Sequence, residues 1–264
     1  MLLDRVSKWL LDMIISLGDI PKVIDYCVGV RYSYVLIRDR DGREWLGVAL
    51  TPIEDTIGSP YELPDHVDCT SLLDYVSSLS PTIKSLGVAL LNALSSYLLW
   101  GRGINSGFII KTGDEIIYLL DKLIEEPAVV IGNMGPLVRR LRSQGLKNIR
   151  VLERNPCFRC GVALPDTALS RTVPRNATLV VTGATLVNDT IDYIIRISKE
   201  RSCRIILVGP TAAVHPKPLI QEGVYALASM VPISNEKVIR IIKLGGGRWL
   251  FSKFCKHYLA LSLN

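Results

Sequence analysis

The hydrophobic positions of the chain change their pattern near residue 126. From there on, short apolar runs such as "PAVVIG", "TLVVTG" and "CRIILVG" alternate with amphipathic stretches such as "NDTIDYIIRISKE". The runs lack the in/out alternation of a half-exposed strand, which is typical of parallel strands covered on both faces. This pattern predicts a doubly wound α/β domain with a mostly parallel sheet over residues 126–264.

Residues 1–125 instead predict a smaller α+β domain. Helical spacing covers Leu2 to Leu17, and two β-rich runs are joined by a hairpin turn at Arg40-Asp41-Gly42. Further helices follow, including "SPTIKSLGVALLNALSSYLLW", in which Ser80 is the expected cap and Pro81 the first helical residue. The tail "RWLFSKFCKHYLALSL" fits either a strand or a helix.

Composition and charge narrow the classes of partner. The 264 residues are 48% hydrophobic and 21% charged, as in globular proteins, and the net charge is +6. Lysine and arginine are scattered, and the densest basic pieces, Arg139–Arg142 and Lys253–His257, are short. Solvated helix faces explain such pieces better than a nucleic-acid interface, so we expect no nucleic-acid partner.

The apolar N-terminus does not fit an export signal, because Asp4, Arg5, Lys8 and Asp12 interrupt it at helical spacing. The longest apolar stretch, "SLGVALLNALSSYLLW", is too short to cross a bilayer and contains Asn92. We therefore expect a cytoplasmic protein with no membrane partner. Asn92 itself needs a hydrogen-bond partner in an apolar helix, either a neighbouring backbone group or a group across the domain boundary.

Small polar residues follow several of the predicted strands. The ends of parallel strands meet at one edge of a sheet, where helix N-termini leave free N–H groups. Residues after the four strands are Asn133, then Glu153 and Asn155, then Thr182, Gly183, Thr185 and Asn188, and finally Gly209, Pro210 and Thr211. We expect this set to share one ligand-binding site, although Thr185 or Asn188 could simply cap the next helix.

Glu153 ends the second strand about where a ribose-binding acid stands in dinucleotide binders, ~20 residues beyond the first glycine. The first turn has only Gly132 and Gly135 and lacks the G-x-G-x-x-G fingerprint. An equally simple interpretation is a surface glutamate paired with Arg154.

Six cysteines are present, and only Cys157 and Cys160 form a local C-x-x-C pair. One pair supplies two soft ligands, whereas a closed zinc site needs four, which His215 and nearby carboxylates would have to complete. Two free thiols, or a local disulfide in a heat-adapted protein, are the alternatives, and the low glutamine content mildly suits a thermophile. His215, in a loop at the predicted site edge, is expected to line the pocket.

The motifs "VLERNP", "VVTGATLVNDTID" and "ILVGPTAAVHPKPLIQEGV" occur in an order that resembles the heavy-metal chelation domain family, largely uncharacterised archaeal and bacterial proteins. The resemblance runs from about Val129 to Gly247, and "GREWLGVALT" with "SLGVALLNALSS" resembles the smaller domain that accompanies it. It implies an enolase-N-terminal-like domain, a Rossmann-like domain and a cleft between them. The family often has a Gly-His-Phe-Pro type turn after the first strand, where this chain has Gly132-Asn133-Met134-Gly135-Pro136.

The resemblance implies that the cleft residues carry over to Asn92, Glu153, Asn155, Thr182, Gly183, Thr185, Asn188, Gly209, Pro210 and Thr211. Three hypotheses follow. The first is a binding protein for a heavy or transition metal ion or a metal chelate. The second is an enzyme that uses a nucleotide-type cofactor, such as a methyltransferase or an oxidoreductase. The third is a partner-binding protein, for which the apolar tail near Trp249 and Phe251 would allow a homodimer.

Overall fold

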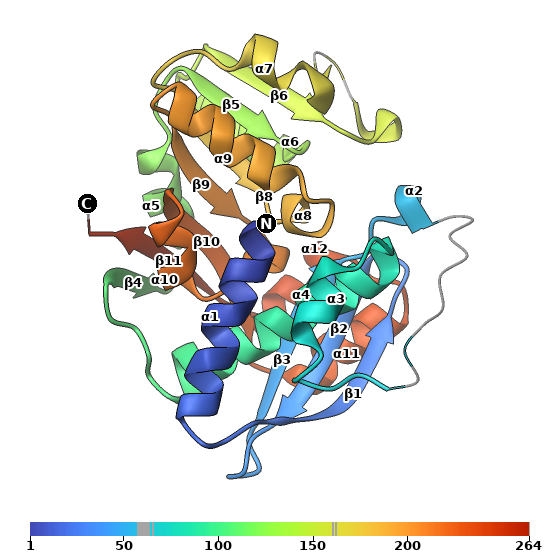
Figure 1. Ribbon diagram of the computed structural model, residues 1–264. Coiled ribbons are helices and arrows are strands. Elements are labelled where there is room, and N and C mark those ends of the chain that lie inside the picture. Colours follow the sequence, from blue (N-terminus) through green and yellow to red (C-terminus); the bar gives the residue numbers. More distant parts are fainter. Residues whose placement is uncertain (57–63, 65, 160, 162, 264) are drawn as a thin grey trace.

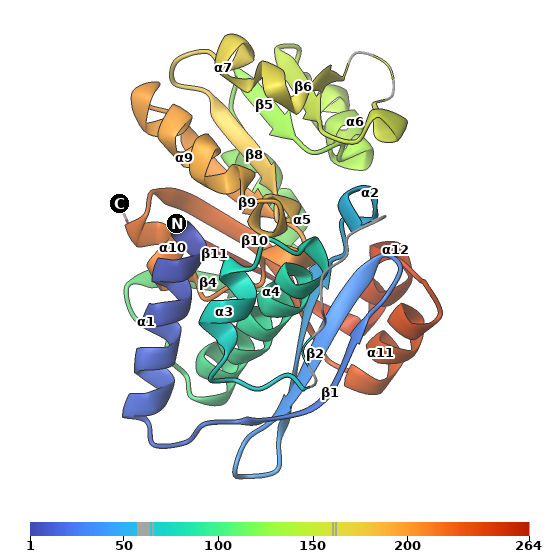
Figure 2. The same cartoon turned by 45° about the vertical axis from the view of Figure 1, so that its right-hand side comes forward.

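The computed structural model describes residues 1–56, 64, 66–159, 161 and 163–263, and these form two β-sheets (Figure 1). One sheet is a three-stranded antiparallel meander, and the other has eight strands, most of them parallel. The α/β class and the mostly parallel sheet that the sequence predicts are confirmed. Figure 2 shows the large sheet above and behind the meander, with helices between and around them.

The meander and its helices come from the first part of the chain. Its elements are α1 (Leu2–Ser16), β1 (Lys22–Val28), β2 (Tyr32–Arg38), β3 (Glu44–Leu50), α2 (Ile53–Thr56), α3 (Leu72–Ser77) and α4 (Pro81–Ser96), which continues as a π-helical turn, η1 (Tyr97–Gly101). The hairpin between β2 and β3 turns at Gly42, whose φ of 80° suits glycine. Ser80 caps α4 as expected, because its side chain accepts a hydrogen bond from the Ile83 N–H.

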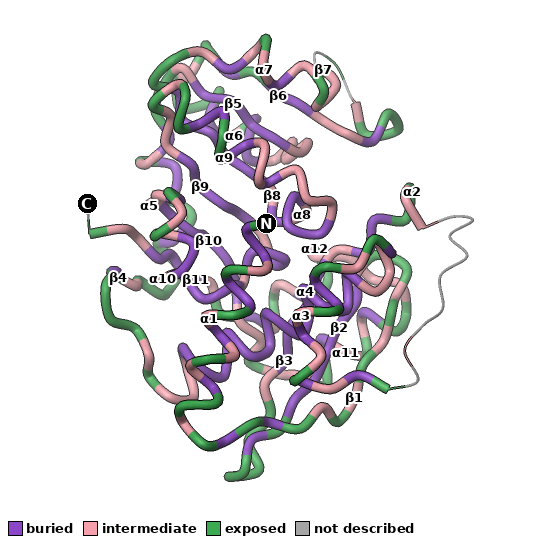
Figure 3. Tube along the Cα trace, viewed as in Figure 1, coloured by how far each residue is buried: buried purple, intermediate pink, exposed green. Residues whose placement is uncertain are grey.

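Helix α4 crosses one face of the meander at very short range. A Cβ atom on Gly47 would lie 2.0 Å from the Ala89 carbonyl oxygen and 2.2 Å from the Ala93 nitrogen, so only glycine fits there. The expectation that the apolar stretch of this helix is too short to cross a bilayer is wrong, because the helix extends over Pro81–Gly101 and is long and apolar enough to do so. However, 89% of its apolar window is buried inside the protein (Figure 3). It is therefore the central core helix of a globular protein.

The large sheet has the strand order β4-β11-β10-β9-β8-β5-β6-β7. Its strands are β4 (Phe108–Thr112), β5 (Ala128–Ile131), β6 (Ile149–Glu153), β7 (Leu164–Pro165), β8 (Thr178–Thr182), β9 (Arg204–Val208), β10 (Val224–Pro232) and β11 (Cys255–Ser262). From β10 to β7 the pairs are parallel, while β11 and β4 are antiparallel additions at the other edge. The six parallel strands thus follow the doubly wound order, with the reversal between β5 and β8.

Helical elements connect these strands, and several of them cover the faces of this sheet (Figure 1). They are α5 (Ile116–Leu123), α6 (Gly135–Ser143), η2 (Pro156–Phe158), η3 (Asp166–Ala168), α7 (Leu169–Thr172), α8 (Ala184–Val187), α9 (Thr190–Glu200), η4 (Pro210–Ala212), α10 (Pro216–Gln221), α11 (Asn235–Lys243), α12 (Arg248–Phe251) and η5 (Ser252–Phe254). Every residue of β5 is buried, which explains its unbroken apolar sequence.

Three features differ from the sequence-based expectations. Strand β4, which lies before the expected boundary at residue 126, pairs with β11 in the large sheet. The ambiguous tail is both helical and extended, forming α12, η5 and β11 in turn. Phe251, offered as part of a dimer surface, is fully buried in a core cluster with Tyr34 of β2 and Val238 of α11. Helices α11 and α12 therefore pack on the meander, on the face opposite α4.

Candidate functional site

A cavity of about 1060 Å³ lies at the carboxyl ends of β5, β6 and β8, against the upper end of the meander. The strand order reverses between β5 and β8, which is where open α/β sheets bind ligands. Six of the residues predicted from the strand ends line this one cavity: Asn133, Glu153, Asn155, Thr182, Thr185 and Asn188. Leu50, Thr51, Pro52 and Glu54 line it from the meander side.

Gly132 shapes the cavity floor between β5 and β8. Its φ is 94°, and a Cβ atom there would lie 2.6 Å from Thr182 Cγ2. Both the backbone conformation and the space therefore require glycine. As a result, the loop after β5 runs directly against Thr182, and the polar ends of the two strands stay side by side.

Glu153 holds the loops that follow β5 and β6. Its Oε2 accepts a hydrogen bond from the Asn133 N–H at 2.6 Å, and its Oε1 accepts one from the Asn155 N–H at 2.8 Å. The Asn133 side-chain amide donates to the Phe158 carbonyl at 2.6 Å. Both carboxylate oxygens thus already accept backbone hydrogen bonds, which positions Asn133 and Asn155 at the cavity wall.

Arg154 links this wall to the meander side. Its guanidinium forms an ion pair with Asp55 of α2 at 3.2 Å. Arg159 braces the same loop, since it donates to the carbonyls of Glu153 and Arg154 at 2.8 and 2.7 Å. Both Arg154 and Glu153 are described, and no ion pair joins them. The surface pair of these two residues that the sequence suggested is therefore absent from the structure.

The polar cluster after β8 combines local structural roles with exposure to the cavity. The Thr185 hydroxyl donates to the Thr182 carbonyl at 2.7 Å, and Asn188 Oδ1 accepts from the Thr190 hydroxyl at 2.7 Å. Gly183 is needed for a different reason, because a Cβ atom there would lie 2.5 Å from the Ala212 nitrogen. Neither Thr185 nor Asn188 is the N-cap of the helix that follows, because the N-caps of α8 and α9 are Gly183 and Asp189. Local hydrogen bonds therefore explain part of the cluster, while Thr182, Thr185 and Asn188 still line the cavity.

Asn92 and the loop after β9 connect the two sheets and do not line the cavity. The Asn92 side-chain amide donates to the Val48 carbonyl at 2.8 Å and to the Thr211 carbonyl at 3.0 Å. The Thr211 hydroxyl accepts from the Leu50 N–H at 2.9 Å. Gly209 is the N-cap of η4 and Pro210 is its first residue, so both directly precede Thr211 in the chain. These residues hold the end of β3, and Leu50 of that strand lines the cavity.

His215 is a core residue outside the cavity lining. Its ring is fully buried, with Trp9 at 4.8 Å and Phe108 at 5.8 Å between ring centroids. Nε2 contacts the Ile104 carbonyl at 2.7 Å, while Nδ1 accepts from the Lys217 N–H at 3.3 Å, which places the proton on Nε2. Burial lowers the pKa of His215 to about 4, with the hydrogen bond to Ile104 opposing the shift. The expectation that His215 lines the pocket is wrong, because the loop folds back into the core.

The described members of the predicted metal set, Cys157 and His215, do not belong to a metal-ligand cluster. Cys157 is exposed on η2, and Cys160 lies outside the described residues. Among the residues that the structure describes, no group of three or more His, Cys, Asp or Glu side chains is arranged to hold a metal ion. His215, the third residue proposed for this set, is committed to the core contacts above.

Several cavity residues were not identified from the sequence. Arg31 comes from the turn before β2 and Tyr32 from the first position of β2. Arg248 and Trp249 come from α12, and Phe158 comes from η2. Trp249 and Phe158 are 67% and 59% exposed, so aromatic rings stand at the accessible part of the cavity. A periodicity argument could not find these residues, because isolated arginines and aromatics in turns are typical of ordinary surface.

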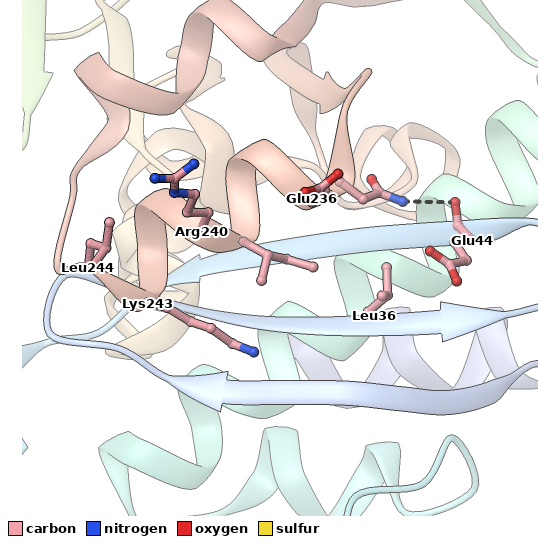
Figure 4. Close-up of a pocket in the computed structure, with 8 residues that line it drawn as sticks. Leu36, Glu44, Glu236, Arg240, Lys243 and Leu244 are labelled. Carbon is pink, nitrogen blue, oxygen red and sulfur yellow. Dashed lines mark hydrogen bonds between the residues drawn. The ribbon is translucent and has the colours of Figure 1, made fainter.

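A second, more open hollow of about 560 Å³ lies between α11 and the outer face of β2 and β3 (Figure 4). Its charged side chains include Glu44, Glu236, Arg240 and Lys243, around an apolar floor that contains Leu36. Asn235 bridges its end by donating to the Glu44 carbonyl at 3.3 Å. None of the predicted site residues lies there.

The comparisons with known proteins assign the family. Residues 115–261 match the family profile DUF364, described as "Putative heavy-metal chelation", and residues 12–95 match DUF4213, which carries the same description. The chain belongs to the DUF364 family. Both halves of the chain thus support the resemblance drawn from the sequence motifs.

The similarity to three relatives extends over nearly the whole chain. An uncharacterised protein of Methanocaldococcus jannaschii is 28% identical, with 98% of this chain and 97% of that protein covered. A crystal structure of a DUF364 family protein of unknown function from Pyrococcus horikoshii matches with a TM-score of 0.83 at 28% identity, covering 98% of this chain and 99% of that one. A DUF364 family structure from Desulfitobacterium hafniense matches in fold, with a TM-score of 0.74 at 18% identity and 97% and 98% coverage.

Proposed function

We propose that this DUF364 protein binds a metal chelate, that is, a metal ion already held by a small organic ligand, in the cavity between the two sheets. The observation that carries the proposal is the nature of the cavity lining. The cavity gathers hydroxyl, amide, carboxylate and guanidinium groups, including Thr182, Asn188, Glu153 and Arg154. These groups suit the periphery of a polar organic molecule.

The arrangement of donors favours a chelate over a bare ion. A protein site for a transition metal needs three or four converging His, Cys or carboxylate ligands. The described residues contain no such cluster, and both Glu153 oxygens accept backbone hydrogen bonds. A chelate brings its own donor atoms, so the protein needs only to recognise its outer surface. The volume of about 1060 Å³ is ample for such a molecule.

The experiment compares a chelate with its parts. Thermal unfolding is measured with nickel citrate, with free Ni²⁺ and with citrate alone, on protein purified without a metal-affinity tag. We expect nickel citrate near 100 times its dissociation constant to raise the melting temperature by about 5 to 10 °C. Free Ni²⁺ should give a much smaller shift. Tryptophan fluorescence, compared between the parent and Trp249→Phe, offers a second readout, because Trp249 lines the cavity.

A cavity-filling variant makes the test specific. Ala184 lines the cavity, and Ala184→Phe should remove the response to nickel citrate. Ser143→Phe, on the exposed surface of α6, is the matched control and should retain it. Chelate binding that survives Ala184→Phe, or stabilisation by free Ni²⁺ alone at equal strength, would contradict the proposal.

A nucleotide-type cofactor enzyme is the second candidate, and the strand order favours it. The reversal between β5 and β8, with an acid at the end of β6, is the arrangement of dinucleotide-binding sheets. The hydrogen bonds to Asn133 and Asn155 weigh against Glu153 as a ribose ligand. Thermal unfolding with S-adenosylmethionine and NAD⁺ at millimolar concentration separates the candidates: a shift that exceeds that of nickel citrate would favour the enzyme.

A further inference from the structure

The wall of the cavity that comes from the meander and α12 is basic. Arg31 lies in the turn between β1 and β2, Tyr32 begins β2, and Arg248 begins α12. All three line the cavity. Figure 2 shows α12 beside the upper end of β2, facing the part of the protein that contains β6 and α6. The basic wall therefore lies across the cavity from Glu153.

The Arg31 side chain lies against Gly247, the residue that precedes Arg248. A Cβ atom on Gly247 would lie 3.4 Å from Arg31 Cδ and 3.5 Å from Arg31 Nη1. The Arg31 side chain thus passes directly over the backbone that precedes Arg248. Two segments from opposite ends of the chain meet at this point, and each contributes one guanidinium group.

Neither guanidinium group is neutralised within the described part of the chain. Arg154, the other arginine of the cavity, pairs with Asp55, but Arg31 and Arg248 form no ion pair with any described residue. Arg248 instead stacks over the Trp249 ring at 4.8 Å. Glu54 of α2 also lines the cavity, without an ion pair to a described residue. Two unpaired guanidinium groups that line the same cavity favour binding of an anion there.

Tyr32 adds a neutral donor to the pair. Its ring packs edge-on against Phe251, with centroids 5.1 Å apart, and its hydroxyl has no hydrogen-bond partner among the described residues. Burial raises the pKa of Tyr32 to about 12, although Arg248 and Arg31 oppose the shift. The hydroxyl therefore keeps its proton at neutral pH and can donate it to an oxygen atom.

We infer that Arg31, Tyr32 and Arg248 form an oxyanion subsite, which binds a carboxylate or phosphate group of the cavity ligand. Guanidinium groups match the geometry of such oxyanions through paired N–H donors, and the hydroxyl supplies one further hydrogen bond. This inference rests on the proposed function for the position of the ligand, since both use the same cavity. It adds the charge and the chemical class of one end of that ligand.

Metal-free probes test the subsite by itself. Isothermal titration calorimetry at low ionic strength measures the affinity for citrate and for pyrophosphate, without metal, so that carboxylate and phosphate are compared directly. The double variant Arg31→Gln/Arg248→Gln is expected to weaken the preferred anion by at least about 10-fold. Tyr32→Phe should weaken it about 2- to 10-fold, because one hydrogen bond is lost.

The matched control is Arg43→Gln/Arg142→Gln, which removes two exposed arginines outside the cavity lining and gives the same net charge. We expect its affinity to stay within about 2-fold of the parent. Equal losses in the two double variants would show a general charge effect and overturn the subsite, as would the lack of saturable binding of either anion. Arg31→Lys keeps the charge without the paired donors, and it gives a second reading if the double variant does not fold.

The two proposals fail in different ways. If citrate or pyrophosphate binds in an arginine-dependent manner while nickel citrate shows no added stabilisation, the chelate proposal fails and the subsite stands. If nickel citrate binds and is lost in Ala184→Phe, but is unaffected by Arg31→Gln/Arg248→Gln, the chelate proposal stands and the subsite is wrong.

Discussion

The side-chain amide of Asn92 donates to the carbonyl of Thr211 at 3.0 Å, and so joins the core helix of the meander to the loop after β9. The same amide donates to the Val48 carbonyl at 2.8 Å. Asn92 is fully buried, so both carbonyls depend on it in a region without solvent. The two sheets therefore share a polar contact at the centre of their interface.

Asn92→Leu should destabilise the protein by about 2 to 3 kcal/mol, because two buried carbonyls lose their donor. Urea unfolding followed by circular dichroism measures the change. Ser95→Ala, one turn along α4, is the control: the Ser95 hydroxyl is buried without a partner among the described residues, so its removal should be neutral or slightly stabilising. Equal effects of the two substitutions would contradict this assignment.

Lys84 and Asp189 form a second link between the halves of the chain. The Lys84 side chain is only 6% exposed, and its ammonium group contacts the Asp189 carboxylate. Lys84→Met should cost about 3 kcal/mol, because it leaves a partly buried carboxylate unpaired. Asp189→Asn should cost a similar amount, because it leaves the buried ammonium group of Lys84 unpaired. Asparagine tolerates the positive φ of 60° at this position, so the substitution adds no backbone strain.

A double-mutant cycle then isolates the pair. Lys84→Met/Asp189→Asn should recover much of the loss, since no unpaired charge remains. If the two single losses simply add in the double variant, the pair does not contribute as the structure indicates.

His215 predicts a pH dependence of stability. Its pKa of about 4 in the folded protein lies below the ordinary histidine pKa of 6.5, so the unfolded chain binds the proton more readily between these values. The contribution of the neutral His215 ring to the free energy of unfolding is therefore complete above pH 6.5. It is lost as the pH falls toward 4, and the loss amounts to up to about 3 kcal/mol. His215→Gln keeps an amide donor for the Ile104 carbonyl but cannot titrate in this range.

The measurement compares the free energy of unfolding of the parent and His215→Gln from pH 7.5 to 4. Asp4, Asp68 and Glu222, whose pKa values are lowered chiefly by side-chain hydrogen bonds, reduce stability in acid in both proteins. The difference between the curves therefore reports His215, and parallel curves would show that the ring is not protected as described.

Gly132→Ala should both destabilise the protein and disturb the cavity. Gly145, at the end of α6, has a similar φ of 101° but nothing within 4 Å of an added Cβ. Gly145→Ala should therefore cost about 1 kcal/mol from backbone strain alone. Gly132→Ala adds the clash with Thr182 and should cost at least about 1 kcal/mol more. Thermal unfolding of the two variants checks the difference, and equal losses would contradict the close approach of the two strands.

The sequence was most informative where burial is complete. The apolar runs of β5, β8 and β9 are buried on both faces, so their residue types alone indicate parallel strands. The polar residues after β5, β6 and β8 could then be placed at one edge, because parallel strands must end there together. The direction of the strands alone thus places Asn133, Glu153 and Thr182 near one another, without any knowledge of side-chain contacts. All three residues line one cavity.

Long-range contacts explain what sequence reasoning missed. Strand β4 is short, and Ile109 is 46% exposed, so its pattern gives no sign that it pairs with β11. Arg31 and Arg248 look like ordinary surface arginines in the sequence, although Arg31 lies against Gly247 and both arginines line the cavity. The loop after β9 has the expected polar residues, but Thr211 contacts β3 and Asn92 instead of the cavity. Such outcomes depend on which distant segment fills a space, and periodicity does not encode that.

Elements from the first half of the chain cross to elements from the second half: α1 packs on α10, β4 pairs with β11, and β2 packs on α11. A clamshell motion, in which the two halves swing apart to admit a guest, would have to break these crossings. We therefore expect a guest to enter by diffusion through the existing opening of the cavity, whose lining includes the exposed Trp249. Stopped-flow association rates should then rise linearly with guest concentration, without the plateau that a slow opening step would impose.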